Sequence, residues 1–328
     1  MPTYNIIKFK NLTPLHIGTG KENQYDFSAA SLHSDTLSAA LAALRAQGGK
    51  TYDLEDFLRS FTISSTFPFW DNICFLPKIQ GKINVKVNAK EEHEYRKQLK
   101  KVKYIDVLLW NKLMQGEELI VEESQLNGDF LIRPFVEFEK PYTSQVNQRV
   151  SIPRVANINA EPFFFNWTYF HKKAGLYCLI DVKDKETYNE LLKLFELLGE
   201  TGLGTDRSVG GGKFETEAGE LLLPEIKDAN QTMLLSLYIP AKEEIKNLNL
   251  NTARYELLLR GGYMAGSSDE SLRHLRKRSV YAFNVGSLFP TTKKITGEIV
   301  NLTPEWNGVH EVFRSGRPFY LPVKINEA

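Results

Sequence analysis

The stretch ETGLGTDRSVGGGKFE, from Glu200 to Glu215, contains five glycines together with Arg207, Ser208 and Lys213. Apolar residues at helical spacing follow Asp184 and precede this stretch, and the residues after it alternate as in a strand. It is therefore expected to be a loop that joins a helix to a strand. Glycines permit positive φ and close backbone approach, and free N–H groups in such a loop can bind an anion. A helix cap needs only one glycine, so five glycines with interleaved cations favour an anion-binding loop.

The order of residues excludes two familiar nucleotide-binding loops. A P-loop requires Lys followed by Ser or Thr, whereas Lys213 is followed by Phe214. A dinucleotide-binding fingerprint lies between a strand and a following helix, and the expected order here is the reverse. The loop therefore suits the backbone of a longer polyanion better than a mononucleotide.

The composition is typical of a globular protein, with 42% hydrophobic and 25% charged residues among 328. Because 41 basic and 40 acidic residues leave a formal net charge of +1, any binding of nucleic acid must come from local clusters. Cys74 and Cys178 form no Cys-x-x-Cys pair, so neither a disulfide scaffold nor a metal site is expected. No apolar run has the length of a signal peptide or a bilayer span, so we expect a cytoplasmic protein without membrane contact.

The order of predicted elements indicates an α+β fold. An opening strand at 4–10 leads into a turn that contains His16 and Gly18, and Ser34 or Asp35 is expected to cap the following helix. A short helix at about 53–60 and several strands then precede the glycine-rich loop. This order is typical of the split βαβ arrangement in ferredoxin-like folds.

Two departures from that order suggest further organisation. Residues 88–116 have mixed charge and helical spacing, which indicates an inserted segment whose lysines form a solvated helix face. After Pro224 the strand pattern begins again, which predicts a second domain.

Two other places combine arginines with features that suit RNA. Arg149 and Arg154 lie in a polar stretch before an aromatic run, and aromatic rings with nearby arginines can stack bases and hold phosphates. The aromatic run itself is better explained as a core strand. The densest basic cluster of the chain ends a glycine- and serine-rich stretch, and its candidate binding residues are Arg273, Arg276 and Arg278.

The sequence contains none of the usual catalytic motifs. No His-Glu-x-x-His, Gly-x-Ser-x-Gly or kinase set occurs. His33 stands beside Ser34 and Asp35, and such a trio could move protons on RNA. Helix capping and packing are the simpler explanation of the trio. We therefore expect no enzyme activity and no cofactor.

Five segments together resemble a known family. They are YNIIKFKNLTPLHIGTG, HSDTLSAAL, GLGTDRSVGGGKF, SVYAFNVGSLF and GVHEVFRSGRPFYLPV. They are similar to subunit four of the Csm complex, a RAMP-superfamily component of type III-A CRISPR interference complexes, and the likeness covers essentially the whole chain. It implies two ferredoxin-like (RRM-like) domains, at 1–225 and 226–328. It also implies a β-hairpin thumb at about 137–160 and, with the pattern above, a helical insertion at about 80–130.

The resemblance further implies a non-catalytic subunit in antiviral defence. Such a subunit binds the 5′ tag of the CRISPR RNA, docks against the large polymerase-like subunit and the backbone RAMP subunit, and meets target RNA indirectly. By position, the RNA-binding loop comprises Gly202, Gly204, Arg207, Ser208, Gly210, Gly211, Gly212 and Lys213. The other candidate RNA-binding residues are Arg149, Arg154, Arg273, Arg276, Arg278, His16 and Gly18. The alternative is a metal-independent endoribonuclease that processes CRISPR repeat RNA, with His16 or His33 as proton carrier.

Overall fold

The computed structural model describes residues 2–18, 26–29, 32–88, 92–152, 160–264, 266–267, 269–290, 293–306 and 309–326. A nine-stranded sheet runs through the first two thirds of the chain, in the order β13–β1–β12–β3–β4–β6–β9–β8, with β2 also paired to β12. The strands are β1 (Thr3–Lys10), β2 (Phe61–Ile63), β3 (Phe67–Trp70), β4 (Ile73–Pro77), β6 (Tyr104–Asp106), β8 (Leu126–Asn127), β9 (Phe130–Leu131), β12 (Ala174–Val182) and β13 (Glu215–Leu222). The expected mixed α+β class is confirmed.

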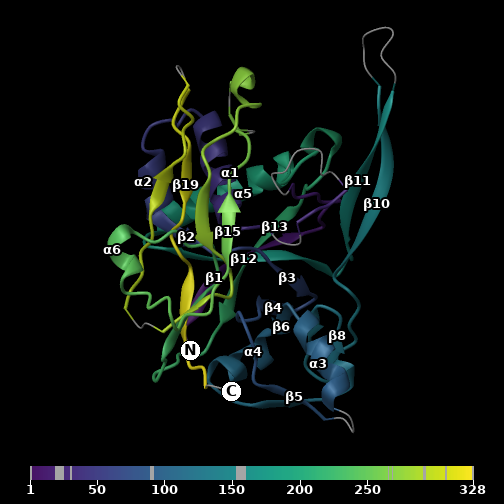
Figure 1. Ribbon diagram of the computed structural model, residues 1–328. Coiled ribbons are helices and arrows are strands. Elements are labelled where there is room, and N and C mark those ends of the chain that lie inside the picture. Colours follow the sequence, from purple (N-terminus) through teal and green to yellow (C-terminus); the bar gives the residue numbers. More distant parts are fainter. Residues whose placement is uncertain are drawn as a thin grey trace.

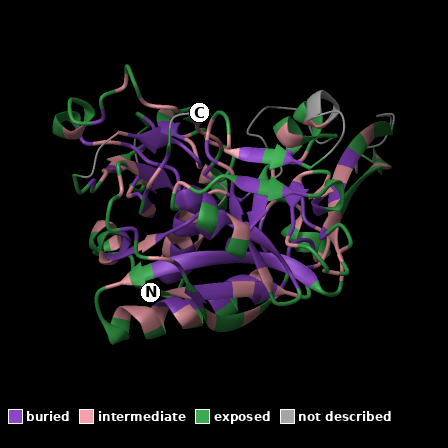
Figure 2. Cartoon of the chain, turned by 90° about the horizontal axis from the view of Figure 1, so that it is seen from below, coloured by how far each residue is buried: buried purple, intermediate pink, exposed green. Residues whose placement is uncertain are grey.

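Three helices cover one face of β1 and β12, namely α1 (Ser34–Gln47), α2 (Leu54–Ser60) and α5 (Lys185–Thr201). Their apolar residues form one buried cluster with those of the two strands, because strand side chains alternate between faces while helix side chains recur every three to four residues. Helix α5 begins as predicted, since the Asp184 carboxylate accepts a hydrogen bond of 2.7 Å from the Thr187 N–H. Figure 2 shows the buried residues gathered along the strands and the exposed ones on loops and outer helix faces.

The last third of the chain, from Gln231 onward, packs partly on the opposite face of this sheet, where Leu321 and Val323 join the same buried cluster as Ile6 and Leu179. It consists of short strands in small sheets, with little helix. The elements are β14 (Gln231–Leu234), α6 (Lys242–Ile245), β15 (Leu257–Arg260), η3 (Glu270–Leu272), β16 (Val280–Phe283), β17 (Leu288–Phe289), β18 (Ile299–Asn301), β19 (Phe313–Ser315) and β20 (Tyr320–Val323). None of the helices in the described ranges has the length and apolar character needed to cross a bilayer.

The segment predicted as a helical insertion is mixed rather than helical. Its helices are α3 (Glu92–Lys101) and α4 (Val107–Met114), and its remaining elements are β5 (Val85–Val87), β6, β7 (Leu119–Val121), η1 (Glu123–Gln125), β8 and β9. Strands β6, β9 and β8 extend the main sheet beyond β4. The apolar pair Ile105 and Leu131 lies in register there and is fully buried, so core packing overrides the local helical spacing.

A long antiparallel hairpin is formed by β10 (Tyr142–Ser151) and β11 (Glu161–Phe170) and projects from the body of the molecule (Figure 1). The structure places this hairpin at 142–170, further along the chain than the expected thumb at about 137–160. The aromatic run predicted as a core strand is therefore its second strand. Phe165 and Trp167 on one face of β11 are buried, whereas Phe164 on the other face is exposed.

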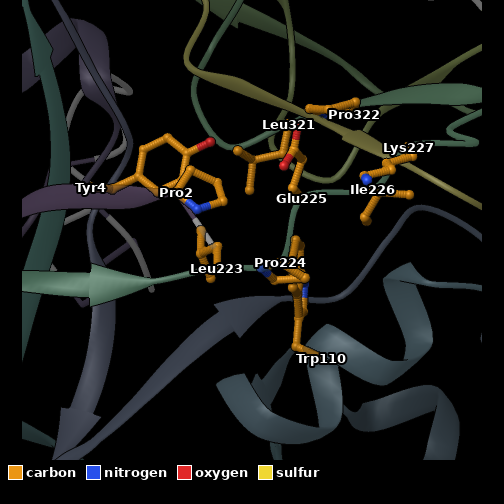
Figure 3. A pocket seen from close by; sticks show the side chains of 10 residues that line it. All are labelled: Pro2, Tyr4, Trp110, Leu223, Pro224, Glu225, Ile226, Lys227, Leu321 and Pro322. Atoms are coloured by element: carbon orange, nitrogen blue, oxygen red, sulfur yellow. The ribbon is translucent and has the colours of Figure 1, made fainter.

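One cavity of about 470 Å³ lies away from the glycine-rich loop (Figure 3). It is lined by Pro2, Tyr4, Trp110, Leu223, Pro224, Glu225, Ile226, Lys227, Leu321 and Pro322. Since no residue of the loop contributes to its wall, this cavity is not part of the candidate site.

Both cysteines are buried free thiols. Cys74 lies on β4 and Cys178 on β12, in the centre of the sheet. Burial raises the pKa of the Cys74 thiol to about 11 and raises that of Cys178 even more.

Candidate nucleic-acid interface

The glycine-rich loop, residues 202–213, connects α5 to β13 as predicted. It contains one 3-10 turn, η2 (Arg207–Val209). The residues with positive φ are Gly202 at 82°, Gly204 at 79°, Asp206 at 58°, Gly210 at 86° and Gly212 at 69°. Side chains with a Cβ rarely adopt such values, which explains four of the five glycines.

Four of these glycines, Gly202, Gly204, Gly211 and Gly212, also permit close packing. A Cβ added to Gly212 would lie 2.0 Å from the carbonyl oxygen of Leu203, and one on Gly204 would lie 2.2 Å from that of His16. A Cβ on Gly211 would lie 2.7 Å from the indole ring of Trp167 on β11. Gly210 is different, because a Cβ there would meet nothing within 4 Å. The loop is thus pressed between the segment 13–16 and the hairpin.

The N–H groups of the loop are largely used inside the protein, so the expectation that they face phosphates is wrong for most of them. Gly212 N–H donates to Pro14 O at 2.9 Å, and Lys213 N–H donates to Thr13 Oγ1 at 2.8 Å. The N–H groups of Gly202, Gly210 and Gly211 bond to carbonyls of the preceding turn of helix or loop. The reason is that tight packing brings carbonyl oxygens, and for Lys213 the Thr13 hydroxyl, within reach of these donors.

The exposed tip of the loop carries the side chains that can meet a ligand. Arg207, Ser208, Val209 and Lys213 are all exposed, whereas Gly202, Gly211 and Gly212 are buried. No carboxylate among the described residues pairs with Arg207 or Lys213. The arrangement is therefore a rigid backbone that presents two free cations and a hydroxyl to solvent.

Arg149 ties the hairpin to this loop. Its guanidinium forms an ion pair with Asp206 and lies over the rings of Phe165 at 4.6 Å and Trp167 at 5.3 Å. Each partner of the ion pair keeps about a third of its side-chain exposure, 34% for Arg149 and 31% for Asp206. Gly18 also adjoins the loop, since a Cβ on it would lie 3.5 Å from Thr205 Cγ2. The structure thus brings Arg149 and Gly18 to the loop, as the predicted site requires.

His16 supports the loop from inside. Its side chain is 1% exposed, its Nδ1 lies 2.7 Å from Asn166 O, and its ring centroid is 4.4 Å from that of Phe165. Its carbonyl oxygen accepts a hydrogen bond of 3.0 Å from the Thr205 N–H. The prediction that the His16 side chain contacts RNA or carries a proton does not fit this burial.

The other predicted cations fall elsewhere. Arg154 lies outside the described residues. Arg273, Arg276 and Arg278 are exposed. Their side chains contact residues of the last third of the chain and not the glycine-rich loop. Arg273 Nε donates to Ser267 O at 2.9 Å, and Arg278 donates to Asn301 O at 2.8 Å. Arg273 also forms an ion pair with Glu270 at 3.1 Å, so these arginines are a separate and partly neutralised group.

The start of α1 differs from the predicted cap. His33 is the N-cap residue and its side chain makes no capping bond, while Ser34 and Asp35 lie inside the helix. Asp35 is 1% exposed and forms ion pairs with Arg260, at 3.0 Å, and with Arg314. These two arginines come from β15 and β19. The Asp35 carboxylate therefore joins α1 to the last third of the chain instead of capping a helix. The sequence analysis identified neither arginine. It drew attention to Asp35 through the HSDT segment, but that segment gives no information on the partners of Asp35.

Among the described residues, no group of three or more histidine, cysteine, aspartate or glutamate side chains is placed to hold a metal ion. The exposed side chains of Arg207 and Lys213 are of the kind that binds anions.

Solved structures place the fold. Over the full length of both chains, the protein matches a chain from the crystal structure of a Csm1-Csm4 cassette in complex with cA4, with a TM-score of 0.62 and 19% identity. It matches a chain from a Csm3-Csm4 subcomplex of the type III-A CRISPR-Cas interference complex with a TM-score of 0.61 and 20% identity, over 98% of this chain and 99% of that one. The fold is that of a protein component of type III-A CRISPR complexes.

Sequence relatives identify the family. The CRISPR system Cms protein Csm4 of Mycobacterium tuberculosis (strain CDC 1551 / Oshkosh) is 32% identical over 175 residues, which cover 52% of this chain and about half, 54%, of that relative. The Csm4 protein of Streptococcus thermophilus is 24% identical over 98% of each chain. Residues 227–323 match the family described as CRISPR Csm4 C-terminal domain. The likeness to Csm4 proteins that the five segments indicated is therefore confirmed, by the family model in residues 227–323 and by the Streptococcus thermophilus relative over nearly the whole chain.

Proposed function

We propose that the chain is a non-catalytic RNA-binding subunit of a type III-A CRISPR effector complex, acting in the cytoplasm. It holds the 5′ tag of the CRISPR RNA, joins the large polymerase-like subunit to the backbone subunit, and meets target RNA indirectly. The observation that carries this proposal is the match of one fold, over its whole length, to chains solved with Csm1 and with Csm3. Two ferredoxin-like domains, at 1–225 and 226–328, are part of the same proposal.

The exposed loop tip supports RNA binding. Arg207 and Lys213 stand on a backbone that is fixed by internal hydrogen bonds, so this backbone loses little conformational entropy when a phosphate binds. Each charge-assisted hydrogen bond to a phosphate oxygen contributes about 1.5–3 kcal/mol. The tether between Arg149 and Asp206 holds the hairpin beside this tip, so one RNA strand can touch both.

The state of two histidines supports a non-catalytic role. A general base works best with a pKa near the operating pH. Burial, with the nearby charges of Arg260 and Arg314, lowers the pKa of His33 to about 3. His16 is enclosed by Phe165 and Asn166. Burial keeps the His33 imidazole unprotonated at neutral pH, and the enclosed His16 ring is kept away from RNA, which weakens the endoribonuclease alternative.

The test is binding of tag RNA by variants of the loop tip. Arg207→Gln together with Lys213→Gln should lower the affinity of the purified chain, and of the complex, for the tag and reduce the salt dependence by about two phosphate contacts. Lys193→Gln, an exposed lysine on the outer side of α5, is the matched control and should change neither quantity. Equal affinity and salt slope in the double variant and the parent would refute the assigned interface.

A second measurement separates the two candidate functions. Incubation of the purified chain with repeat RNA in a chelator should leave the RNA intact. Specific cleavage that is lost in a folded His33→Ala variant would establish the endoribonuclease instead.

A further inference from the structure

A group of charged side chains lies where α1 meets the last third of the chain. We name it the junction cluster, and its members are His33, Asp35, Arg260, Lys277 and Arg314. Asp35 Oδ1 and Oδ2 accept bonds of 3.0 Å from Arg260, and Oδ2 also pairs with Arg314. Arg314 donates a further bond of 3.0 Å to the carbonyl oxygen of Gly261.

Lys277 belongs to the same group through the adjacent backbone. Its N–H donates to Gly262 O at 3.0 Å, next to the carbonyl that Arg314 holds. Its neighbours Arg276 and Arg278 are exposed, while Lys277 itself is partly buried. Burial first, and then the charge of Arg260, lowers the pKa of Lys277. Among the described residues, no acidic group bonds to its ammonium.

The charges of the junction cluster do not balance. Arg260, Lys277 and Arg314 carry three positive charges, whereas Asp35 carries a single negative charge, which pairs with the two arginines and not with Lys277. Buried cations without partners are strongly disfavoured, so an excess of this kind requires an anion or works against the fold.

Two further features indicate that the missing charge belongs to a ligand. Nδ1 of His33 is buried and has no hydrogen-bond partner among the described residues. A buried polar atom without a partner is uncommon and calls for an explanation. The cluster is also open, because Arg260 keeps 24% of its side-chain exposure. An anion can therefore approach from solvent.

We infer that the junction cluster is a binding site for one phosphate group. Arg260 and Lys277 contact the phosphate oxygens, His33 offers a hydrogen bond through Nδ1, and Asp35 with Arg314 holds Arg260 in place. A planar guanidinium beside an ammonium suits phosphate, which has several oxygens and more than one negative charge to share. The phosphate comes from an RNA strand or from a free phosphate compound. The RNA source rests on the proposed function, whereas the phosphate site itself does not.

The first experiment uses inorganic phosphate and the purified full chain. Thermal unfolding is followed as phosphate replaces chloride at constant ionic strength, and the Tm of the parent should rise with the logarithm of the phosphate concentration. Lys277→Gln should abolish that rise without lowering the Tm in chloride, because it removes an unpaired charge. Lys277→Arg and the exposed Lys193→Gln should keep the rise.

Two results would overturn the site. One is a parent Tm that responds to phosphate no more than to chloride. The other is a Lys277→Gln variant that keeps the whole phosphate-dependent rise.

The second experiment identifies the source of the phosphate. Binding of tag RNA is compared between the parent and Lys277→Gln, with a series of oligonucleotides that each carry one neutral methylphosphonate linkage. If RNA supplies the phosphate, one linkage weakens binding to the parent but not to Lys277→Gln. If both proteins bind every oligonucleotide alike while the Tm effect stands, the ligand is a free phosphate compound. If the parent binds no tag RNA but shows the Tm effect, the proposed function fails and the site remains.

Discussion

The glycine-rich loop and the junction cluster use similar side chains in opposite ways. In the loop, the backbone satisfies its own hydrogen bonds and Arg207 and Lys213 point to solvent. In the junction cluster, Arg260 and Arg314 point inward and share the carboxylate of Asp35. Removing an exposed cation costs little folding stability, whereas removing one member of a buried ion pair leaves its partner without a counter-charge. The difference teaches that the density of basic residues in a sequence does not reveal which of them bind ligands and which join domains.

The largest effect is expected from removing the shared carboxylate. Asp35→Ala leaves two arginines partly buried without their anion, and breaking a buried pair typically costs about 3–5 kcal/mol. Urea denaturation measures the loss. The control is Asp184→Ala at the exposed start of α5, where loss of a cap costs about 0.5–2 kcal/mol. Losses of the same size at both positions would remove the contrast between an inward and an outward charge.

Two glycines of the loop test whether its backbone is fixed by packing. Gly210→Ala changes only a left-handed residue with open space around it and should cost about 1–2 kcal/mol. Gly212→Ala adds to that strain a Cβ at 2.0 Å from a carbonyl oxygen, so the backbone must shift and the free energy of unfolding should fall further. Denaturation curves of the two variants decide the matter. If Gly212→Ala is no worse than Gly210→Ala, the loop is less constrained than its packing indicates.

The pH dependence of stability tests the buried state of His33. Its pKa is about 3 in the folded chain and about 6.5 when unfolded, so between these values the unfolded state binds more protons. Stability contributed by the neutral imidazole is therefore complete above pH 6.5 and is lost as the pH falls toward 3, by up to about 1.4 kcal/mol per pH unit. Unfolding midpoints of the parent and His33→Gln between pH 7 and 5 should diverge, with the parent losing more. Parallel curves would mean that His33 is solvated.

The smallest effect is expected at the tether between hairpin and loop. Arg149→Met keeps contact with the rings of Phe165 and Trp167 but removes the ion pair with Asp206. Both partners are about a third exposed, so solvent screens the pair and its coupling energy should be about 0.2–1 kcal/mol. A double-mutant cycle with Asp206→Asn measures this energy. A coupling of zero would show that the hairpin and the loop are not linked through this pair.

The sequence predicted the position of the loop but only part of its design. Helical spacing after Asp184 and strand alternation after Lys213 are local signals, and the structure confirms both elements. Three of the loop N–H groups, those of Thr205, Gly212 and Lys213, have their partners in residues 13–16, nearly two hundred positions away, and no local pattern reveals them. The junction is harder still, because Asp35 lies 225 residues from Arg260 and 279 from Arg314.

The shortness of some strands also limited what could be predicted from the sequence. Strands β8 and β9 have two residues each, which is too few for an alternating pattern to be recognised. The helical spacing of α3 was recognised instead, so the whole insertion was predicted as helical. The family resemblance supplied what local patterns could not, namely the expectation of a hairpin in the region where β10 and β11 lie.

The burial of Cys74 and Cys178 makes their thiols probes of how often the sheet opens. Their thiols carry raised pKa values in the middle of the sheet, so a disulfide reagent attacks them only when that region opens. The rate of thiol modification under native conditions therefore reports how often the sheet opens. Because the same two thiols are present in every variant proposed above, a ligand that slows their modification reveals itself without any label or change to the protein.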